Sequence, residues 1–172
     1  SFINIMERCK KFNINIIYAS SSSVYGDLKK FPLKESQECN KPLSLYGSTK
    51  IFNELTSYNY FHLYNINSLG LRFFTVYGPW GRPDMALFKF VKNITQNKSI
   101  DVYNYGKHSR SFTYIDDIVD AIELLLEKYL DINQNYCEVL NIGGNESVKL
   151  IDFIRLIEKR LNKKAKINFL PI

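Results

Sequence analysis

Two side chains near the start of one predicted helix have the types and spacing needed for proton transfer. Tyr46 and Lys50 are four residues apart in a segment with helical apolar spacing, so both project from the same face of the helix, one turn apart. An ammonium group in that position favours the phenolate form of a tyrosine, which can then act as a general base near neutral pH. The pair is a weak signal by itself, because a chain with 12 tyrosines and many lysines produces such spacing by chance.

A run of four serines upstream strengthens this signal. The run, residues 20–23, follows the β-branched segment 13–19, which predicts a buried strand. A hydroxyl at the end of that strand could share a proton with the Tyr46 phenol. A serine run after a strand also serves simply as a turn or a helix cap, so the residues themselves leave both interpretations open.

The elements that must position these residues alternate between helix and strand along the chain. Asp84 is the predicted cap of one helix, and Asp116 and Asp117 complement the N-terminal dipole of the next. Apolar spacing predicts helices near 2–9, 45–63, 84–91, 118–130 and 150–161, and extended runs predict strands at 13–19, 66–74, 99–103, 139–142 and 165–170. The alternation predicts an α/β fold with parallel strands, in which chemistry sits at the carboxyl ends of the strands.

Composition narrows the classes of protein that remain. The 172 residues, 45% of them hydrophobic, suffice for one sizeable core, and no apolar run approaches the roughly 20 residues needed to cross a bilayer. The net charge is +6, but the lysines are scattered and form no basic stripe interleaved with aromatic residues, so we expect no nucleic-acid partner. An acidic small-molecule ligand would suit this charge.

The metal-binding and redox residue types give no pattern of their own. Cys9, Cys39 and Cys137 lie far apart, and neither His62 nor His108 has a potential ligand at metal spacing. We therefore expect no metal and no disulfide framework. A reducing compartment, the cytoplasm, is the expected location.

Five segments of the chain resemble the extended short-chain dehydrogenase/reductases, and within them the nucleotide-sugar 4-epimerases. The segments are YASSSSVYG (18–26), LYGSTK (45–50), LRFFTVYGPWGRPDMALFKF (71–90), IDVYNYGKHSRSFTYIDDIVDAI (100–122) and LNIGG (140–144). They are similar to the UDP-glucuronate 4-epimerase branch in particular, and they extend over essentially the whole chain.

The resemblance implies a Rossmann-like doubly wound sheet, bound NAD and three catalytic residues. Tyr46 would take the proton of the sugar 4-hydroxyl while hydride leaves C4 for NAD⁺, Lys50 would support the phenolate and bind the nicotinamide ribose, and Ser21 would hydrogen-bond the 4-oxygen. The 4-keto sugar would then rotate and take the hydride back on its other face. The implied reaction interconverts UDP-glucuronate and UDP-galacturonate.

The resemblance also assigns binding residues for the cofactor and for the UDP-sugar. The cofactor-binding residues are Ser20, Tyr46, Lys50 and Phe73, and the substrate-binding residues are Ser21, Ser22, Ser23, Thr75, Arg82, Tyr103 and Arg110. The two arginines are suited to a diphosphate, because a guanidinium pairs bidentately with phosphate oxygens. Tyr103 lies on the strand expected to hold the uracil.

Two of these serines help to distinguish among related reactions. Ser22 and Ser23 occupy the positions that resemble Asp-Glu in the related 4,6-dehydratases. The related decarboxylases usually carry an acidic residue at the second of these positions. The two serines therefore favour epimerisation. A dehydratase or decarboxylase remains an alternative. A non-catalytic nucleotide-sugar-binding protein is a second alternative.

One family motif does not occur in this sequence. No GxGxxG follows a predicted strand, although that turn brings a dinucleotide pyrophosphate to a helix N-terminus. We therefore expect a fragment lacking that N-terminal region and the C-terminal end. In it, residues 1–80 form the C-terminal half of the NAD-binding domain, and residues 81–172 form a substrate domain interleaved with returning Rossmann elements. By itself such a chain is expected to bind NAD⁺ poorly and to be inactive. The full-length protein is expected to be a homodimer that uses the helices beginning near Leu45 and Asp84.

Overall fold

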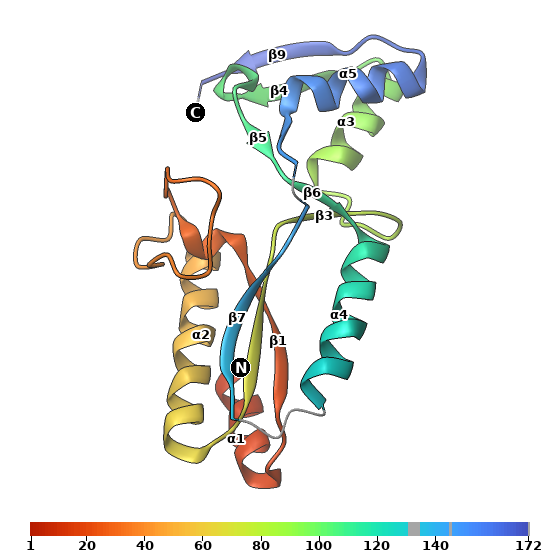
Figure 1. Ribbon diagram of the computed structural model, residues 1–172. Coiled ribbons are helices and arrows are strands. Elements are labelled where there is room, and N and C mark those ends of the chain that lie inside the picture. Colours follow the sequence, from red (N-terminus) through yellow and green to blue (C-terminus); the bar gives the residue numbers. More distant parts are fainter. Residues whose placement is uncertain (131–134, 145, 172) are drawn as a thin grey trace. The chain divides into compact units, whose positions relative to one another are not determined.

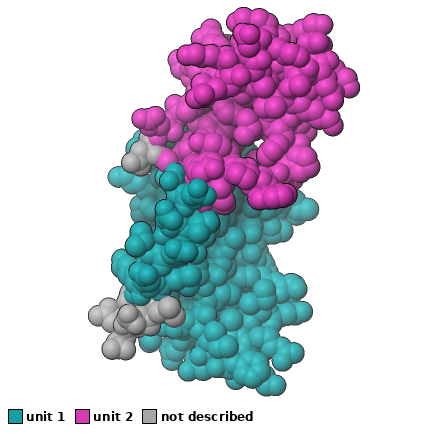
Figure 2. All heavy atoms as spheres, turned by 90° about the vertical axis from the view of Figure 1, so that its right-hand side faces the viewer, with its two compact units in different colours: residues 1–74, 116–143 teal, residues 75–115, 144–172 magenta. Residues whose placement is uncertain are grey.

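The computed structural model describes residues 1–130, 135–144 and 146–171. The chain forms two compact units, residues 1–74 with 116–143 and residues 75–115 with 144–172, which are shown in teal and magenta in Figure 2. Each unit thus combines two separate stretches of sequence. The chain leaves the first unit after Phe74 and returns to it at Asp116; the division at residue 80 into a cofactor-binding and a substrate-binding domain stays a prediction.

The first unit is built around a parallel sheet with the strand order β1-β2-β7 (Figure 1). Alternate residues of the central strand face opposite sides of the sheet. Leu69 and Leu71 pack against Tyr129 and other residues of α4 on one side, whereas α2 packs on the sheet from the other side, with α1 beside it. The elements are α1 (Phe2–Phe12), β1 (Ile16–Ser21), η1 (Ser22–Tyr25), α2 (Leu45–Tyr64), β2 (Ser68–Phe73), α4 (Ile115–Leu130) and β7 (Cys137–Ile142).

The second unit contains three short strand pairs, two α-helices and one short 3₁₀ helix (η) in its described part. Its core is formed by Phe90 and Ile94 of α3, Ile100 and Val102 of β4, and Ile154 of α5. The strands β3 and β6 pair in parallel, as do β4 and β9, while β5 and β8 are antiparallel. The elements are β3 (Thr75–Tyr77), α3 (Ala86–Thr95), β4 (Ser99–Tyr103), η2 (Asn104–Gly106), β5 (Ser109–Arg110), β6 (Phe112–Tyr114), β8 (Val148–Lys149), α5 (Leu150–Leu161) and β9 (Lys166–Leu170).

The predicted α/β fold with parallel strands is confirmed, and two local predictions are wrong. The strand predicted at 13–19 runs on through Ser20 and Ser21, so only Ser22 and Ser23 follow it. Asp84 does not cap α3: Met85 occupies that position without a side-chain hydrogen bond, and the Asp84 carboxylate bonds Arg82 instead. Among the described residues, no helix has the length and apolar character needed to cross a membrane.

Candidate active site

The predicted residues of the first unit gather where its parallel strands end. Ser21, the last residue of β1, is in register with Phe73 of β2 and, through it, with Ile142 of β7. The Ser21 hydroxyl oxygen accepts a hydrogen bond of 3.2 Å from the backbone N–H of Ser23 and so caps η1. The cap and the strand end together hold Ser21 at the carboxyl edge of the sheet, where α/β proteins place their ligands.

Two glycines allow α2 to begin directly against this edge. A Cβ on Gly47 would lie 2.7 Å from the carbonyl oxygen of Ser23, so only glycine lets the first turn of α2 approach η1 this closely. Gly26 ends η1 at a φ of 60°, and a Cβ there would lie 2.0 Å from the carbonyl oxygen of Lys41. The serine run and the start of α2, which carries Tyr46, are thereby packed together.

Lys50 connects α2 to β1 and lies next to the Tyr46 ring. Its Nζ donates a 2.8 Å hydrogen bond to the carbonyl oxygen of Ala19 on β1 and lies 5.5 Å from the centroid of the Tyr46 ring. An ammonium has three N–H donors, so the bond to Ala19 leaves capacity for a ligand. Tyr46 is 54% exposed, so its side chain is open to solvent.

The sequence interpretation missed a buried ion pair directly behind these residues. Arg72 of β2, 4% exposed, donates two hydrogen bonds to the carboxylate of Glu54 on α2, from Nε at 2.9 Å and from Nη2 at 2.7 Å. Ser20 Oγ donates to the same carboxylate at 2.5 Å. The Ser20 hydroxyl is therefore buried against Glu54, and its assignment to cofactor binding stays a prediction. One sequence signal was available: Glu54 follows Lys50 at the same four-residue spacing that separates Lys50 from Tyr46.

A buried tyrosine extends this polar cluster to η1 and β7. Tyr25 Oη accepts a 3.0 Å hydrogen bond from Arg72 Nη1 and donates one of 2.7 Å to Asn141 Oδ1. Burial raises the pKa of the Tyr25 phenol, while the hydrogen bond from Arg72 opposes that rise. Burial alone would lower the pKa of the Arg72 guanidinium, but its hydrogen bonds to Glu54 and Tyr25 outweigh burial and raise that pKa. Arg72 is thus charged and Tyr25 protonated at neutral pH.

The remaining predicted substrate residues all belong to the second unit. Thr75 begins β3 and is half-buried, Tyr103 ends β4 with 57% of its side chain exposed, and Arg110 lies exposed on β5. Arg82 pairs with Asp84 through bonds of 3.0 and 2.5 Å, which lower the pKa of the Asp84 carboxyl. The binding roles of these four residues stay predictions.

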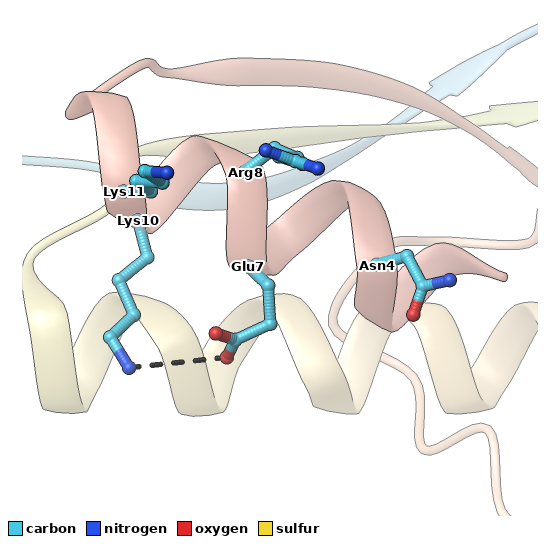
Figure 3. A pocket seen from close by; sticks show the side chains of 5 residues that line it. All are labelled: Asn4, Glu7, Arg8, Lys10 and Lys11. Carbon is cyan, nitrogen blue, oxygen red and sulfur yellow. Dashed lines mark ion pairs between the residues drawn. The ribbon is translucent and has the colours of Figure 1, made fainter.

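A surface hollow on α1 contains none of the predicted site residues. It is lined by Asn4, Glu7, Arg8, Lys10 and Lys11 (Figure 3). Lys10 Nζ lies 3.9 Å from the Glu7 carboxylate and 4.1 Å from the centroid of the Tyr64 ring. Because α1 precedes the amino end of β1, this hollow is remote along the strand from the carboxyl edge, and we assign it no role.

Comparison with known proteins decides the family. The sequence pattern of the NAD dependent epimerase/dehydratase family matches residues 1–143. The chain belongs to this family. The resemblance drawn from the five sequence segments is therefore confirmed, and the Tyr46, Lys50 and Ser21 positions lie within the part of the chain that the epimerase/dehydratase family pattern covers.

Individual relatives within the family are similar along nearly the whole chain. An uncharacterized protein of Methanocaldococcus jannaschii is 54% identical over 171 residues, which are 99% of this chain and 51% of that protein. A probable UDP-glucuronate 4-epimerase of Rhizobium meliloti is 42% identical over 92% of this chain and 50% of its own length. The chain spans about half the length of the curated relatives it matches.

Solved structures share the fold as well. The crystal structure of UDP-glucuronic acid 4-epimerase from Bacillus cereus, in complex with UDP-glucuronic acid and NAD, is 37% identical. It superimposes with a TM-score of 0.88 over 99% of this chain and 53% of that one. The Rossmann-type architecture expected for an epimerase/dehydratase is thus confirmed for this chain.

Proposed function

We propose that the protein carrying this chain is an NAD-dependent nucleotide-sugar 4-epimerase that interconverts UDP-glucuronate and UDP-galacturonate. The observation that carries the proposal is the Lys50 ammonium, bonded to the Ala19 carbonyl oxygen and placed 5.5 Å from the centroid of the accessible Tyr46 ring. Relatives named as UDP-glucuronate 4-epimerases support the choice of substrate.

The residues at the carboxyl edge are suited to the nicotinamide end of NAD. Lys50 has N–H donors for ribose hydroxyls beyond its bond to Ala19, and the half-buried Phe73 closes the adjacent strand end. NAD⁺, when bound, accepts a hydride from C4 of the sugar and later returns it. We propose Lys50, Tyr46 and Phe73 as the residues that hold it.

Proton transfer is the task of the chain's own side chains. Tyr46 Oη, in the phenolate form that the Lys50 ammonium favours, takes the proton of the sugar 4-hydroxyl. It stays a neutral phenol while the 4-keto sugar turns, and it returns the proton when the opposite face of C4 has been reduced. Ser21 Oγ already accepts a hydrogen bond from Ser23 N–H, so its own hydroxyl proton is available to donate to the 4-oxygen. Ser21 therefore orients the sugar for transfer to Tyr46.

The neighbouring serines support epimerisation over elimination or decarboxylation. Ser22 and Ser23 lie half-buried in η1 and supply no acid or base for removing a group from C5 or C6. Their hydroxyls can hydrogen-bond a sugar carboxylate without repelling it. We propose Thr75, Arg82, Tyr103 and Arg110 as further substrate-binding residues, with the two arginines on the diphosphate and Tyr103 near the uracil. Three free cysteines, Cys9, Cys39 and Cys137, support a reducing, cytoplasmic location.

Product analysis tests the proposed reaction. The full-length protein carrying this chain is incubated separately with UDP-glucuronate and with UDP-galacturonate, and the nucleotide sugars are resolved by chromatography. We expect each sugar to yield the same mixture of both, with no net consumption of NAD⁺. A decarboxylated product from either uronate, or a 4-keto-6-deoxy product from the control UDP-glucose, would show that the reaction is wrongly assigned. UDP-glucose serves as the control substrate that lacks the carboxylate.

A further inference from the structure

We propose that Arg72 and Glu54 are positioning residues for the epimerisation. Their buried ion pair, joined by Ser20, sets where α2 lies on the sheet and thereby holds Tyr46 and Lys50 in place against Ser21. The inference rests on the proposed function and extends it to residues that touch neither the sugar nor the cofactor.

The first argument for this role is the spacing of Tyr46, Lys50 and Glu54 along α2. Tyr46, Lys50 and Glu54 follow one another at four-residue intervals, so they form one stripe along the helix. Lys50 and Glu54 both bond residues of β1, so this stripe lies on the side of α2 that faces the sheet. Successive turns are attached to neighbouring residues of β1: Lys50 bonds the Ala19 carbonyl oxygen and Glu54 bonds the Ser20 hydroxyl. Tyr46 lies one turn before Lys50, in the part of α2 whose neighbour Gly47 abuts Ser23 of η1.

The register of the sheet carries the second step. Ser20, Arg72 and Asn141 occupy one row across β1, β2 and β7, one residue before the row that contains Ser21. Arg72 bonds the carboxylate of Glu54 on α2. Its Nη1 also donates hydrogen bonds to Tyr25 Oη and, at 3.4 Å, to the carbonyl oxygen of Glu35. The ion pair therefore links α2 to all three strands and to η1, the element that carries Ser22 and Ser23.

The loop before α2 is attached to the same row. Asn141 N–H donates a 2.8 Å hydrogen bond to the Glu35 carboxylate, and Asn141 Nδ2 donates one of 3.0 Å to the Leu33 carbonyl oxygen. Because Arg72 also bonds the backbone of Glu35, the loop, η1 and α2 share one set of anchors. A shift of the ion pair would consequently disturb the loop, η1 and α2 together.

The physical chemistry of the pair indicates why an ion pair serves here. The Arg72 and Glu54 side chains are only 5% and 11% exposed, and the cost of removing two charges from water makes such a pair a poor source of stability compared with apolar residues of the same volume. A bidentate guanidinium–carboxylate contact, in contrast, fixes both distance and direction. The pair therefore serves to fix the position of α2, and with it Tyr46 and Lys50, on the sheet.

A charge-removing variant with a matched control tests the proposal. Glu54→Gln is made in the full-length protein, and Glu7→Gln serves as the control, because Glu7 bonds Tyr60 and so also ties α2 to a neighbouring element, away from the Ser20 row. Small misplacements of reacting groups cost up to about 100-fold in rate. We expect kcat of Glu54→Gln to fall about 10- to 100-fold with KM nearly unchanged, and the acidic half-point of its kcat–pH profile to move to higher pH, because Lys50 no longer supports the phenolate correctly.

A second variant covers failure of the first to fold. Glu54→Gln leaves the Arg72 charge buried without its carboxylate, whereas Arg72→Met combined with Glu54→Gln removes both charges and should fold. The double variant is expected to show the same fall in kcat and the same shift of the pH profile. If either folded variant keeps the kcat and pH profile of Glu7→Gln, the positioning role is wrong.

A measurement without turnover separates this inference from the proposed function. Backbone amide hydrogen exchange in residues 21–25 and 45–50 should be faster in Glu54→Gln than in Glu7→Gln, because the anchors of η1 and of the first turns of α2 are weakened. Unchanged exchange in these segments would overturn the inference even if the wild-type enzyme is an epimerase. An inactive wild-type protein with the expected exchange difference would instead contradict the proposed function alone.

Discussion

At the residue scale, the proposed reaction depends most directly on the phenol group of Tyr46. Tyr46→Phe removes the proton acceptor and almost no volume, so kcat should fall by about 10² to 10⁴-fold while UDP-sugar binding persists. Steady-state epimerisation assays and calorimetric titration with the UDP-sugar measure the two effects. Tyr58→Phe is the matched control, because Tyr58 is also on α2 and is 58% exposed. Turnover near the wild-type rate in Tyr46→Phe would remove the general-base assignment.

Lys50 should behave differently, because its ammonium is assigned two tasks. Lys50→Met keeps the length of the side chain but removes the charge and the bond to the Ala19 carbonyl oxygen. We expect both a lower kcat and faster loss of NAD from the full-length protein, measured by the NAD content after gel filtration. A variant that loses activity but retains NAD as the wild type does would limit Lys50 to the proton-transfer step.

Tyr129 gives a prediction of stability against pH. Burial, followed by its 2.6 Å hydrogen bond to Glu138, raises the pKa of the Tyr129 phenol from 10.0 to about 12. Because the pKa is raised in the folded state, the protonated Tyr129 phenol adds to the free energy of unfolding. This contribution is complete below about pH 10 and is lost as the pH rises through about 12. Tyr129→Phe should thus cost about 2 kcal/mol at neutral pH, and its difference from wild type in urea unfolding should shrink across that window. A constant difference throughout would contradict the assignment.

At the scale of elements, the close packing of α2 against η1 depends on Gly47. Alanine inside a helix is ordinarily favoured over glycine by about 1 kcal/mol, yet a Cβ on Gly47 would lie 2.7 Å from the Ser23 carbonyl oxygen. We expect Gly47→Ala to lower the free energy of unfolding by about 1 to 2 kcal/mol and to lower kcat, because α2 must move away from the serine run.

The control for Gly47→Ala is Ser48→Ala on the same turn of α2. Ser48 is exposed and its hydroxyl bonds only within the helix start, to the Ser44 carbonyl oxygen. Chemical denaturation and epimerisation assays on both variants decide the question. A stabilised Gly47→Ala protein with normal turnover would show that α2 does not need this close approach.

At the scale of the whole molecule, α2 has an apolar side turned away from the sheet. Leu45, Phe52, Leu55 and Leu63 share that side by their helical spacing and are 83, 50, 60 and 64% exposed. Exposed apolar side chains gathered on one side of a helix favour association. We propose that a second copy of the chain covers it, which gives the homodimer expected from the sequence.

Light scattering of charge-bearing variants tests this assembly. Leu55→Glu in the full-length protein should shift a dimer toward monomers, because a carboxylate would be buried in the apolar contact. Leu156→Glu is the control, since Leu156 is 55% exposed on α5 in the second unit. A dimer that survives Leu55→Glu would exclude this side of α2 as the interface.

The sequence by itself determined the features that depend on local periodicity and motif. The pairing of Tyr46 with Lys50 on one helix face, the α/β alternation and the family all follow from residues close together in the chain. Such features are accessible because helix and strand periods act within a few residues. The boundary of the first unit at Phe74 and the two-residue strands β5 and β8 were not accessible in this way.

Only the tertiary structure decided what lies behind the reacting groups. Ser20, Glu54, Arg72 and Asn141 come from four different elements, and they meet because three parallel strands align in one register beneath α2. The capping of η1 by Ser21 and the pairing of Asp84 with Arg82 likewise depend on backbone geometry that residue types alone do not specify. Register and burial depend on several segments that are distant in the sequence. That Arg72 is buried in an ion pair with Glu54, and not exposed to solvent, therefore follows only from the assembled sheet.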